Sequence, residues 1–264
     1  MTQTIKVDNT TVYIDGTKGP ALVMLHGWPD THAIWARQVA YFRENHRCVT
    51  FTMPGFSRED RQSYSVDAMC DRLSRIVDTV SPATPVILLL HDWGCVFGYE
   101  YAMRNPSRVA RMIGIDVGDA RSKEFLRQTP LKAKLMIVGY QLTLATAWRV
   151  GGAAGDGITR AMAAALGARA RAADVHCGMN YPYAMQWLRH AGGFGGLEAV
   201  APRMPFFYAY GSRKPVMFQT ESWMRALAAT AGNKVKGYDS GHWVMWDRAE
   251  QFNQDLSSWL ISTQ

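Results

Sequence analysis

Short apolar runs alternate with amphipathic segments along much of the chain. The apolar runs have the length of buried strands, whereas the segments between them repeat apolar residues at helical spacing. Strands are predicted over residues 4–7, 11–14, 21–25, 47–51, 86–90, 109–115, 205–210 and 234–238. Helices are predicted over residues 32–45, 66–80, 96–104 and 220–231. Because strands that alternate with helices form a parallel sheet covered on both faces, the pattern predicts an α/β fold with a mostly parallel sheet.

The pattern changes in a block between residues 118 and 197. This block is rich in alanine, contains no clear strand and is interrupted by glycines. Within it, residues 131–148 are predicted to form one or two amphipathic helices. Since strands precede and follow the block, we predict a helical cap (lid) of residues 118–197 inserted into an α/β core of residues 1–117 and 198–264.

Composition excludes several classes of protein. The 264 residues are 48% apolar, which is ample for a buried core. Membrane-spanning helices need about 18 or more apolar residues without polar interruption, and the chain has no such run. The first residues lack the apolar region of an export signal. The four cysteines lack the spacing of zinc sites or disulfide frameworks. We therefore expect a cytoplasmic protein with reduced thiols, no metal and no cofactor.

The net charge of +7 changes this picture little. The basic residues are spread along the chain, and no basic run is interleaved with aromatic residues. This distribution favours solvated basic faces over nucleic-acid binding. The expected partners are water and a small apolar or amphipathic organic substrate, with an anionic substrate left open. The chain is expected to be a monomer or a homodimer.

The segment with the clearest chemistry joins the strand at 86–90 to the helix that follows it. It reads His91-Asp92-Trp93-Gly94. A sharp turn between a buried strand and a helix holds one side chain out at the carboxyl edge of the sheet, and here that side chain is the Asp92 carboxylate. An aspartate nucleophile attacks a saturated carbon and becomes an ester, which is the chemistry of opening epoxides or displacing halide.

Four motifs follow predicted strands in a characteristic order. They are His26-Gly27-Trp28-Pro29, Pro54-Gly55-Phe56-Ser57, His91-Asp92-Trp93-Gly94 and Gly241-His242-Trp243. Together they resemble the α/β-hydrolase superfamily, in its epoxide hydrolase and haloalkane dehalogenase branch, over nearly the whole chain. The resemblance implies the α/β-hydrolase fold, with Asp92 as an ionised nucleophile. It also implies that His242, neutral in the resting enzyme, activates the water that cleaves the ester.

The acid that orients the histidine departs from the usual pattern. Members of this branch often carry Gly-x-x-Asp after the strand that begins here at Phe206, but this chain has Lys214 at the acidic position. A lysine cannot accept the imidazole N–H bond. Some relatives place the acid after the strand that follows the elbow helix, where this chain has Asp116. We expect Asp116 to fix the tautomer of His242 and stabilise its cation, with Asp119 as the reserve candidate.

The resemblance also implies an oxyanion hole and candidate leaving-group acids. The backbone N–H groups of Trp28 and Trp93 are the expected oxyanion donors, and their indole rings are expected to line the pocket. Tyr181 and Tyr183, in the predicted cap, are the candidates for assisting an epoxide oxygen, although aromatic cap residues also simply pack. Leu90 stands where a small residue is usual, so we expect it to crowd the turn.

Three functions are therefore in competition. The leading hypothesis is an epoxide hydrolase that forms an aspartyl ester and releases a diol. The first alternative is a haloalkane or haloacid dehalogenase that uses the same Asp92 ester, with Trp28 and Trp93 around the halide. The second alternative, motivated by Lys214 and Leu90, is a ligand-binding protein that has lost turnover. Hydrogen-bond contact between Asp116 and His242 would favour an enzyme.

Overall fold

The computed structural model describes residues 2–197 and 200–263, and an eight-stranded sheet lies at its centre in the order β1-β2-β4-β3-β5-β6-β7-β8. The strands are β1 Gln3–Val7, β2 Thr10–Asp15, β3 Ala21–Leu25, β4 Arg47–Phe51, β5 Val86–His91, β6 Val109–Ile115, β7 Phe206–Gly211 and β8 Lys234–Tyr238. β1 pairs with β2 and β2 with β4 in antiparallel fashion, and the remaining pairs are parallel. The eight predicted strands and the mostly parallel sheet are thus confirmed.

The central strands are apolar at nearly every position because both faces of the sheet are covered. Successive side chains of a strand point to opposite faces. In β3 and β5, Val23 and Leu88 belong to the core on one face, whereas Met24 and Leu89 belong to the core on the other. Continuous apolar runs are therefore what this sheet requires.

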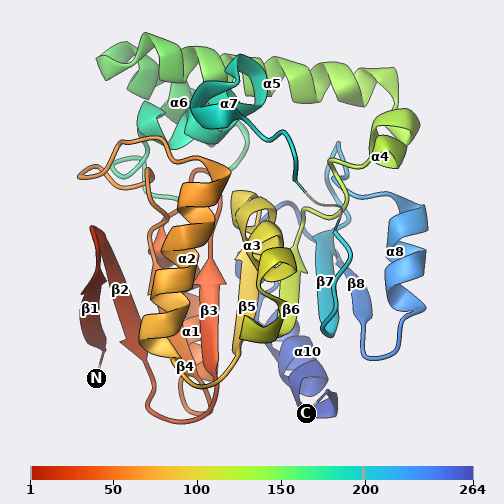
Figure 1. The fold of residues 1–264 in the computed structure, drawn as a ribbon. Coiled ribbons are helices and arrows are strands. Elements are labelled where there is room, and N and C mark those ends of the chain that lie inside the picture. The colour runs from red at the N-terminus through yellow and green to blue at the C-terminus, as the bar shows by residue number, and fades with distance from the viewer. Residues whose placement is uncertain (1, 198–199, 264) are drawn as a thin grey trace.

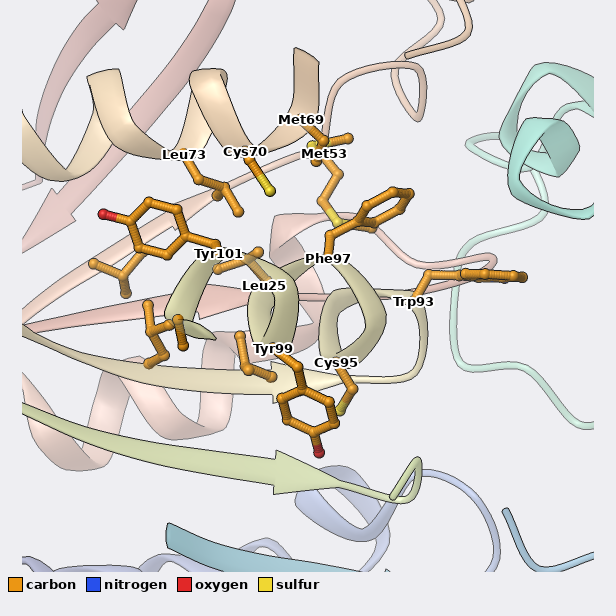
Figure 2. Packing of buried hydrophobic residues seen from close by; sticks show 14 of the residues in the cluster. Leu25, Met53, Met69, Cys70, Leu73, Trp93, Cys95, Phe97, Tyr99 and Tyr101 are labelled. Carbon is orange, nitrogen blue, oxygen red and sulfur yellow. The ribbon is translucent and has the colours of Figure 1, made fainter. Parts of the chain in front are cut away.

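Helices cover each face of the sheet (Figure 1). One core packs beneath α2 (Val66–Val80) and α3 (Trp93–Arg104), and Figure 2 shows side chains of both helices meeting those of β3. The other core packs beneath α1 (Ala36–Phe42) and α10 (Ala249–Ser262). The helix predicted over 66–80 is confirmed, and its Ser65 cap accepts a hydrogen bond from the Ala68 N–H.

Some helix predictions needed correction. The segment predicted as one helix over 32–45 begins with a 3-10 turn, His32–Trp35, before α1. The helix predicted over 220–231 is the shorter α8, Glu221–Ala228. The pattern did not predict α10 or the short α9, Val244–Asp247. These differences concern connections and helix ends, where local sequence patterns are weakest.

The segment between β6 and β7 is helical, as predicted. Its α-helices are α4 Lys123–Gln128, α5 Leu131–Val150, α6 Gly152–Ala165 and α7 Tyr181–Leu188. In Figure 1, α5, α6 and α7 lie across the top of the sheet, beyond the carboxyl ends of the parallel strands. No strand occurs within residues 118–197, all of which are described. The division into cap and core stays a prediction, and its second boundary falls at residues 198 and 199, outside the described residues.

Two expectations from composition can be compared with the structure. The four cysteines, Cys48, Cys70, Cys95 and Cys177, are all buried and none forms a disulfide, as expected of reduced thiols. Within residues 2–197 and 200–263, no helix is both long and apolar enough to cross a bilayer. This includes α5, whose 20 residues form one continuous helix rather than two.

The turn between β5 and α3 contains Leu90, which was expected to crowd it. Leu90 is fully buried. A Cβ atom on Gly98, in α3, would lie 2.4 Å from Cδ2 of Leu90, so the glycine leaves the space that the leucine fills. Gly94 similarly allows α3 to approach β3, since a Cβ atom there would lie 2.4 Å from the carbonyl oxygen of Leu25. The expected crowding is therefore relieved by glycine in the facing helix.

This packing predicts that Gly98→Ala destabilises the fold by roughly 1–3 kcal/mol, the usual cost of inserting a methyl group into a filled core. The measurement is urea unfolding of the variant beside the wild type. Gly157→Ala is the matched control, because nothing lies within 4 Å of a Cβ atom at this helical position. It should be neutral or stabilising by up to about 1 kcal/mol. Adding Leu90→Ala to Gly98→Ala should cost less than the sum of the two single changes. Strict additivity would contradict the proposed fit.

Candidate active site

Asp92 occupies the sharp turn that the sequence predicts between strand and helix. It lies between β5 and α3 with φ +54° and ψ −120°, a region that non-glycine residues adopt only under strain. Its side chain remains 17% exposed and lines a cavity. The turn therefore holds the carboxylate at the carboxyl edge of the sheet, where a ligand can reach it.

The two oxygens of the Asp92 carboxylate have different partners. Oδ1 accepts a hydrogen bond of 2.8 Å from the backbone N–H of Trp28, and Oδ2 lies 3.4 Å from Nε2 of His242. The Trp93 amide borders the same space. A Cβ atom on Gly27 would lie 2.3 Å from Oδ1 of Asp92 and 2.6 Å from the Trp93 nitrogen. Gly27 is thus needed for this close approach, since a side chain here would meet both Oδ1 of Asp92 and the amide of Trp93.

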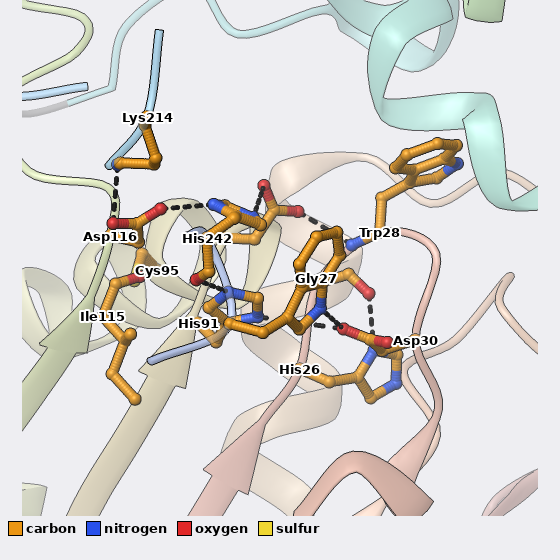
Figure 3. A network of polar contacts seen from close by, with 12 residues as sticks. His26, Gly27, Trp28, Asp30, His91, Cys95, Ile115, Asp116, Lys214 and His242 are labelled. Atoms are coloured by element: carbon orange, nitrogen blue, oxygen red, sulfur yellow. Dashed lines mark hydrogen bonds and ion pairs between the residues drawn. The ribbon is translucent and has the colours of Figure 1, made fainter. Parts of the chain in front are cut away.

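Asp116 lies against His242, as the sequence led us to expect. Nδ1 of His242 is hydrogen-bonded to Oδ2 of Asp116, whose side chain is fully buried (Figure 3). Asp116 follows β6 and has φ +73°, a left-handed conformation that aspartate tolerates better than most residues. The Gly211 N–H donates to Oδ1 of Asp116 at 3.0 Å. The structure therefore joins Asp92, His242 and Asp116 in one contiguous chain of contacts.

The reserve candidate, Asp119, has a different set of partners. Its Oδ1 accepts a hydrogen bond of 2.7 Å from the Thr220 N–H, and its Oδ2 accepts from the hydroxyls of Thr220 and Ser122 at 2.8 and 2.9 Å. Thr220 is the N-cap of α8. Asp119 therefore ties the start of α8 to the segment after β6 and does not contact His242.

Lys214 is the charged neighbour that sequence reasoning did not place. Its Nζ lies 2.6 Å from Oδ1 of Asp116, and its side chain is only 6% exposed (Figure 3). The two side chains form an ion pair. The residue that occupies the usual acidic position thus contacts the replacement acid.

The electrostatics of the group correct one expectation. Burial opposes charge on His242, but the carboxylates of Asp116 and Asp92 outweigh it and raise the pKa of the imidazole to about 9. Burial likewise opposes charge on Asp92, yet hydrogen bonding and charge from His242 bring its pKa below the usual value. At neutral pH the resting site therefore favours imidazolium beside carboxylate. The expected neutral His242 is wrong for this state.

A layer of buried polar side chains lies beneath His242 (Figure 3). His91 Nε2 contacts the His242 carbonyl oxygen at 3.1 Å, and burial lowers the pKa of His91 to about 3. Burial raises the pKa of Asp30 to about 7, although the Trp243 indole donates to its carboxyl group at 2.8 Å. Sequence reasoning missed Asp30. The signal for it was its place directly after the His26–Pro29 motif.

A cavity of about 380 Å³ opens above Asp92. Its lining is mostly apolar and aromatic and includes Trp93, Tyr140, Tyr183 and Phe218. The walls come from α3, from the segments after β6 and β7, and from α4, α5 and α7. Substrate would therefore lie between the sheet edge and the helices above it.

The two tyrosines predicted from the sequence to assist an epoxide oxygen lie in different surroundings. Tyr183 lines the cavity, and its ring packs edge-on against Trp93 at 5.2 Å. The hydroxyl of Tyr181 instead donates to the Pro54 carbonyl oxygen at 3.3 Å, and Tyr181 is not among the residues that line the cavity. Of the two candidates, Tyr183 alone is placed to meet a substrate.

Tyr140, on α5, is a second cavity tyrosine that sequence reasoning missed. Its hydroxyl oxygen accepts a hydrogen bond of 3.1 Å from the Gln141 side-chain amide, which leaves its own O–H free to donate. Burial raises the pKa of both Tyr140 and Tyr183 above the usual value, so both hydroxyls stay protonated. Tyr140 could be identified only from the structure, which shows which face of α5 is turned toward the cavity.

The two tryptophans also differ. The Trp93 ring lines the cavity, as expected. The Trp28 indole N–H instead donates to Oδ1 of Asn180 at 2.7 Å, and Trp28 is not among the cavity-lining residues. The expectation that both rings line the pocket is therefore correct for Trp93 and wrong for Trp28.

Comparison with known proteins supports the fold described above. A family model described as alpha/beta hydrolase fold matches residues 20–140. The chain is 31% identical over 120 residues to the protein named probable oxidoreductase EphD of Mycobacterium tuberculosis, a match covering 44% of this chain and 20% of that protein. It is 31% identical over 101 residues to epoxide hydrolase 3 of Mus musculus, covering 36% of this chain and 27% of that protein. The matches thus span only about a fifth to a quarter of these two relatives.

Solved structures match over nearly the whole chain. A Bacillus megaterium epoxide hydrolase, solved with an inhibitor, has a TM-score of 0.73 at 18% identity, covering 98% of this chain and 99% of that one. A loop variant of the haloalkane dehalogenase DbeA from Bradyrhizobium elkanii has a TM-score of 0.71 at 15% identity, covering 100% of this chain and 97% of that one. The chain has the α/β-hydrolase fold, and it resembles the epoxide hydrolase and haloalkane dehalogenase branch of that superfamily.

Proposed function

We propose that the protein is an epoxide hydrolase that forms an ester on Asp92 and releases a diol. The observation that carries the proposal is the position of the Asp92 carboxylate, which a strained backbone turn holds at the edge of the sheet. Asp92 contacts an oxyanion donor on one oxygen and His242 on the other, and it faces a cavity lined by the hydroxyl-bearing Tyr140 and Tyr183. The relatives and structural neighbours that are epoxide hydrolases support the same reaction.

In the first step, an Asp92 oxygen attacks a ring carbon of the epoxide and the ring C–O bond breaks. The electron pair of that bond passes to the ring oxygen, which becomes an alkoxide. Tyr183 and Tyr140 donate hydrogen bonds to this oxygen as its charge develops. Esterification removes the negative charge of Asp92, so the pKa of the His242 imidazolium falls. The proton of the imidazolium passes to the alkoxide. The products are a neutral hydroxy ester and neutral imidazole.

In the second step, His242 takes a proton from water while the water oxygen adds to the ester carbonyl carbon of Asp92. The carbonyl oxygen becomes an oxyanion beside the N–H groups of Trp28 and Trp93, where each donor contributes about 3 kcal/mol in comparable hydrolytic sites. The intermediate collapses with loss of the diol oxygen, which takes the proton of the new carboxyl group. Asp92 is again a carboxylate and His242 again an imidazolium, so the cycle consumes one epoxide and one water.

The dehalogenase alternative has weaker support in this cavity. A departing halide needs N–H donors in an apolar cradle, and the alternative assigns this task to the two tryptophans. The Trp28 indole is already engaged by Asn180. The cavity offers tyrosine hydroxyls instead, which suit a developing alkoxide. The similarity to a haloalkane dehalogenase structure is compatible with either reaction, because it reflects a fold that both share.

The ligand-binding alternative rested on Lys214 and Leu90. Leu90 is accommodated by Gly98, and Lys214 contacts the acid that orients His242. The hydrogen bond between Asp116 and His242 is the contact that an enzyme of this kind requires. Both departures from the usual pattern are thus compatible with turnover.

Covalent trapping tests the nucleophile and the leaving group together. His242→Gln, mixed with a panel of epoxides and haloalkanes, should accumulate an adduct on Asp92. The variant keeps the Asp92 carboxylate and the tyrosine donors, with water supplying the alkoxide proton in place of His242, whereas the base that activates water for ester hydrolysis is lost. Intact-mass analysis should find the mass of the whole epoxide added, whereas a dehalogenase would add only the alkyl group. Asp92→Asn is the control and should form no adduct. Unchanged epoxide turnover by Asp92→Asn would remove Asp92 from the mechanism.

Substitution of the tyrosines tests the alkoxide donors. Tyr183→Phe and Tyr140→Phe should each lower kcat for epoxide opening by roughly 10²–10⁴-fold, the range for positioned proton donors. Tyr181→Phe is the matched control, since its hydroxyl contacts the Pro54 carbonyl outside the cavity lining, and its kcat should stay within a few-fold of wild type. Equal effects at Tyr181 and Tyr183 would contradict this assignment.

The protonated state of His242 in the resting site can be tested by titrating its imidazole. NMR titration of the His242 imidazole should show protonation persisting to about pH 9 in the wild type. Asp92→Asn removes one of the two carboxylates that favour the cation, so the midpoint should fall by about one unit or more. Glu124→Gln removes a half-exposed carboxylate of α4 and is the control, with no expected shift. A midpoint near pH 6 in the wild type would rule out the resting imidazolium.

A further inference from the structure

Asp116 lies between two cationic side chains, of which the reaction described above uses one. The other is Lys214, which follows β7. The carboxylate of Asp116 is fully buried, and the Lys214 side chain is almost so. Nζ of Lys214 also lies 5.6 Å from the centre of the Phe218 ring, which lines the substrate cavity. Lys214 is thus held between the catalytic group and the cavity wall.

The two oxygens of Asp116 serve different partners. Oδ1 receives Lys214 at 2.6 Å and the Gly211 N–H at 3.0 Å. Oδ2 is left to Nδ1 of His242. Because a buried carboxylate needs a partner to stay ionised, Lys214 can keep Asp116 charged whether or not His242 carries a proton. Figure 3 shows Lys214 at one oxygen of this carboxylate and His242 at the other.

Lys214 changes the charge balance around His242 when Asp92 is esterified. At rest, two carboxylates, Asp92 and Asp116, face two cations, His242 and Lys214. When Asp92 becomes a neutral ester, Asp116 alone faces both cations, and one positive charge is in excess. A lysine ammonium is intrinsically far less acidic than an imidazolium, so the proton leaves His242. If Lys214 were neutral, Asp116 and the imidazolium would balance each other and His242 would keep its proton.

We propose that Lys214 is a positioning residue for the reaction proposed above: it neutralises Asp116 so that His242 becomes a free base once Asp92 has been esterified. The lysine does not touch the substrate in this role. It acts through Asp116 and determines when the histidine can accept a proton from water. The usual acid position has thus become the site of a countercharge for an acid that follows another strand.

The other titratable groups facing His242 do not replace Lys214. The His91 ring lies 4.5 Å from the His242 ring, but burial lowers its pKa to about 3, so it is neutral. Asp30 lies on the far side of His91, with Nδ1 of His91 3.9 Å from its Oδ2, and titrates with a pKa of about 7. Both groups are present in every variant below, so they cancel in the comparison.

The first test needs no substrate. Asp92→Asn imitates the loss of charge that esterification causes, and the His242 imidazole is titrated by NMR in this variant with and without Lys214→Met. Lys214→Met should raise the midpoint of His242 by about one unit or more, because the cation that competes for Asp116 is gone. Lys214→Arg, which keeps the charge, should leave the midpoint near that of Asp92→Asn alone. An unchanged midpoint in the Lys214→Met pair overturns the proposal.

The second test follows the ester in a single turnover. At pH 7, Lys214→Met should hydrolyse the Asp92 ester more slowly than wild type, by about tenfold for each unit by which the His242 midpoint rises above pH 7. The difference should vanish at alkaline pH, where the imidazole is neutral in both proteins. A purely structural role would slow ester formation and hydrolysis alike at every pH, and would overturn the proposal. Lys214→Gln serves as a second neutral variant, with the same expected shift, if methionine impairs folding.

The two proposals fail in distinguishable ways. If wild-type protein forms no ester with any epoxide, the proposed reaction is wrong, whereas the titration of His242 still measures the influence of Lys214. If the ester forms and is hydrolysed with the same pH dependence in wild type and Lys214→Met, the reaction stands and the role of Lys214 is wrong.

Discussion

Four charged side chains with little access to water meet at the carboxyl edge of the sheet. Asp92, His242, Asp116 and Lys214 form a chain of alternating charge in which each contact neutralises its neighbours. Isolated charges at such depth would be too costly to retain, so the members of the chain depend on one another. In the proposed reaction the same balance makes His242 the group that loses its proton when the charge of Asp92 is removed. The contacts that stabilise the site are therefore also those that control its proton transfer.

The parallel sheet makes this meeting possible. Asp92 follows β5, Asp116 follows β6, Lys214 follows β7 and His242 follows β8, and these strands are consecutive neighbours in the sheet. Since parallel strands end at the same edge, residues far apart in the sequence arrive side by side. Small residues then permit the close approach, as Gly27 does beside Asp92. The site is thus a property of strand order as much as of any single motif.

The helices between β6 and β7 contribute the other half of the site. They bring Tyr140 and Tyr183 over Asp92, and most of the side chains with which they line the cavity are apolar. Exclusion of water strengthens the electrostatic interactions at the sheet edge, because the local dielectric constant is lower. The charged side chains below and the hydroxyl groups above accordingly suit different steps of the proposed reaction.

Local sequence patterns were sufficient for the eight strands and the strand-to-helix turn at Asp92, because burial on both faces and sharp turns restrict residue type locally. The choice of Asp116 came instead from the resemblance to relatives that place the acid after the strand equivalent to β6. Local patterns could not separate Tyr183 from Tyr181 or reveal Tyr140, because helix phase above the cavity depends on packing against distant elements. They also could not assign a charge to His242 or a partner to Lys214. Those properties arise only when folding removes water and brings several strand ends together, so the tertiary structure alone decides them.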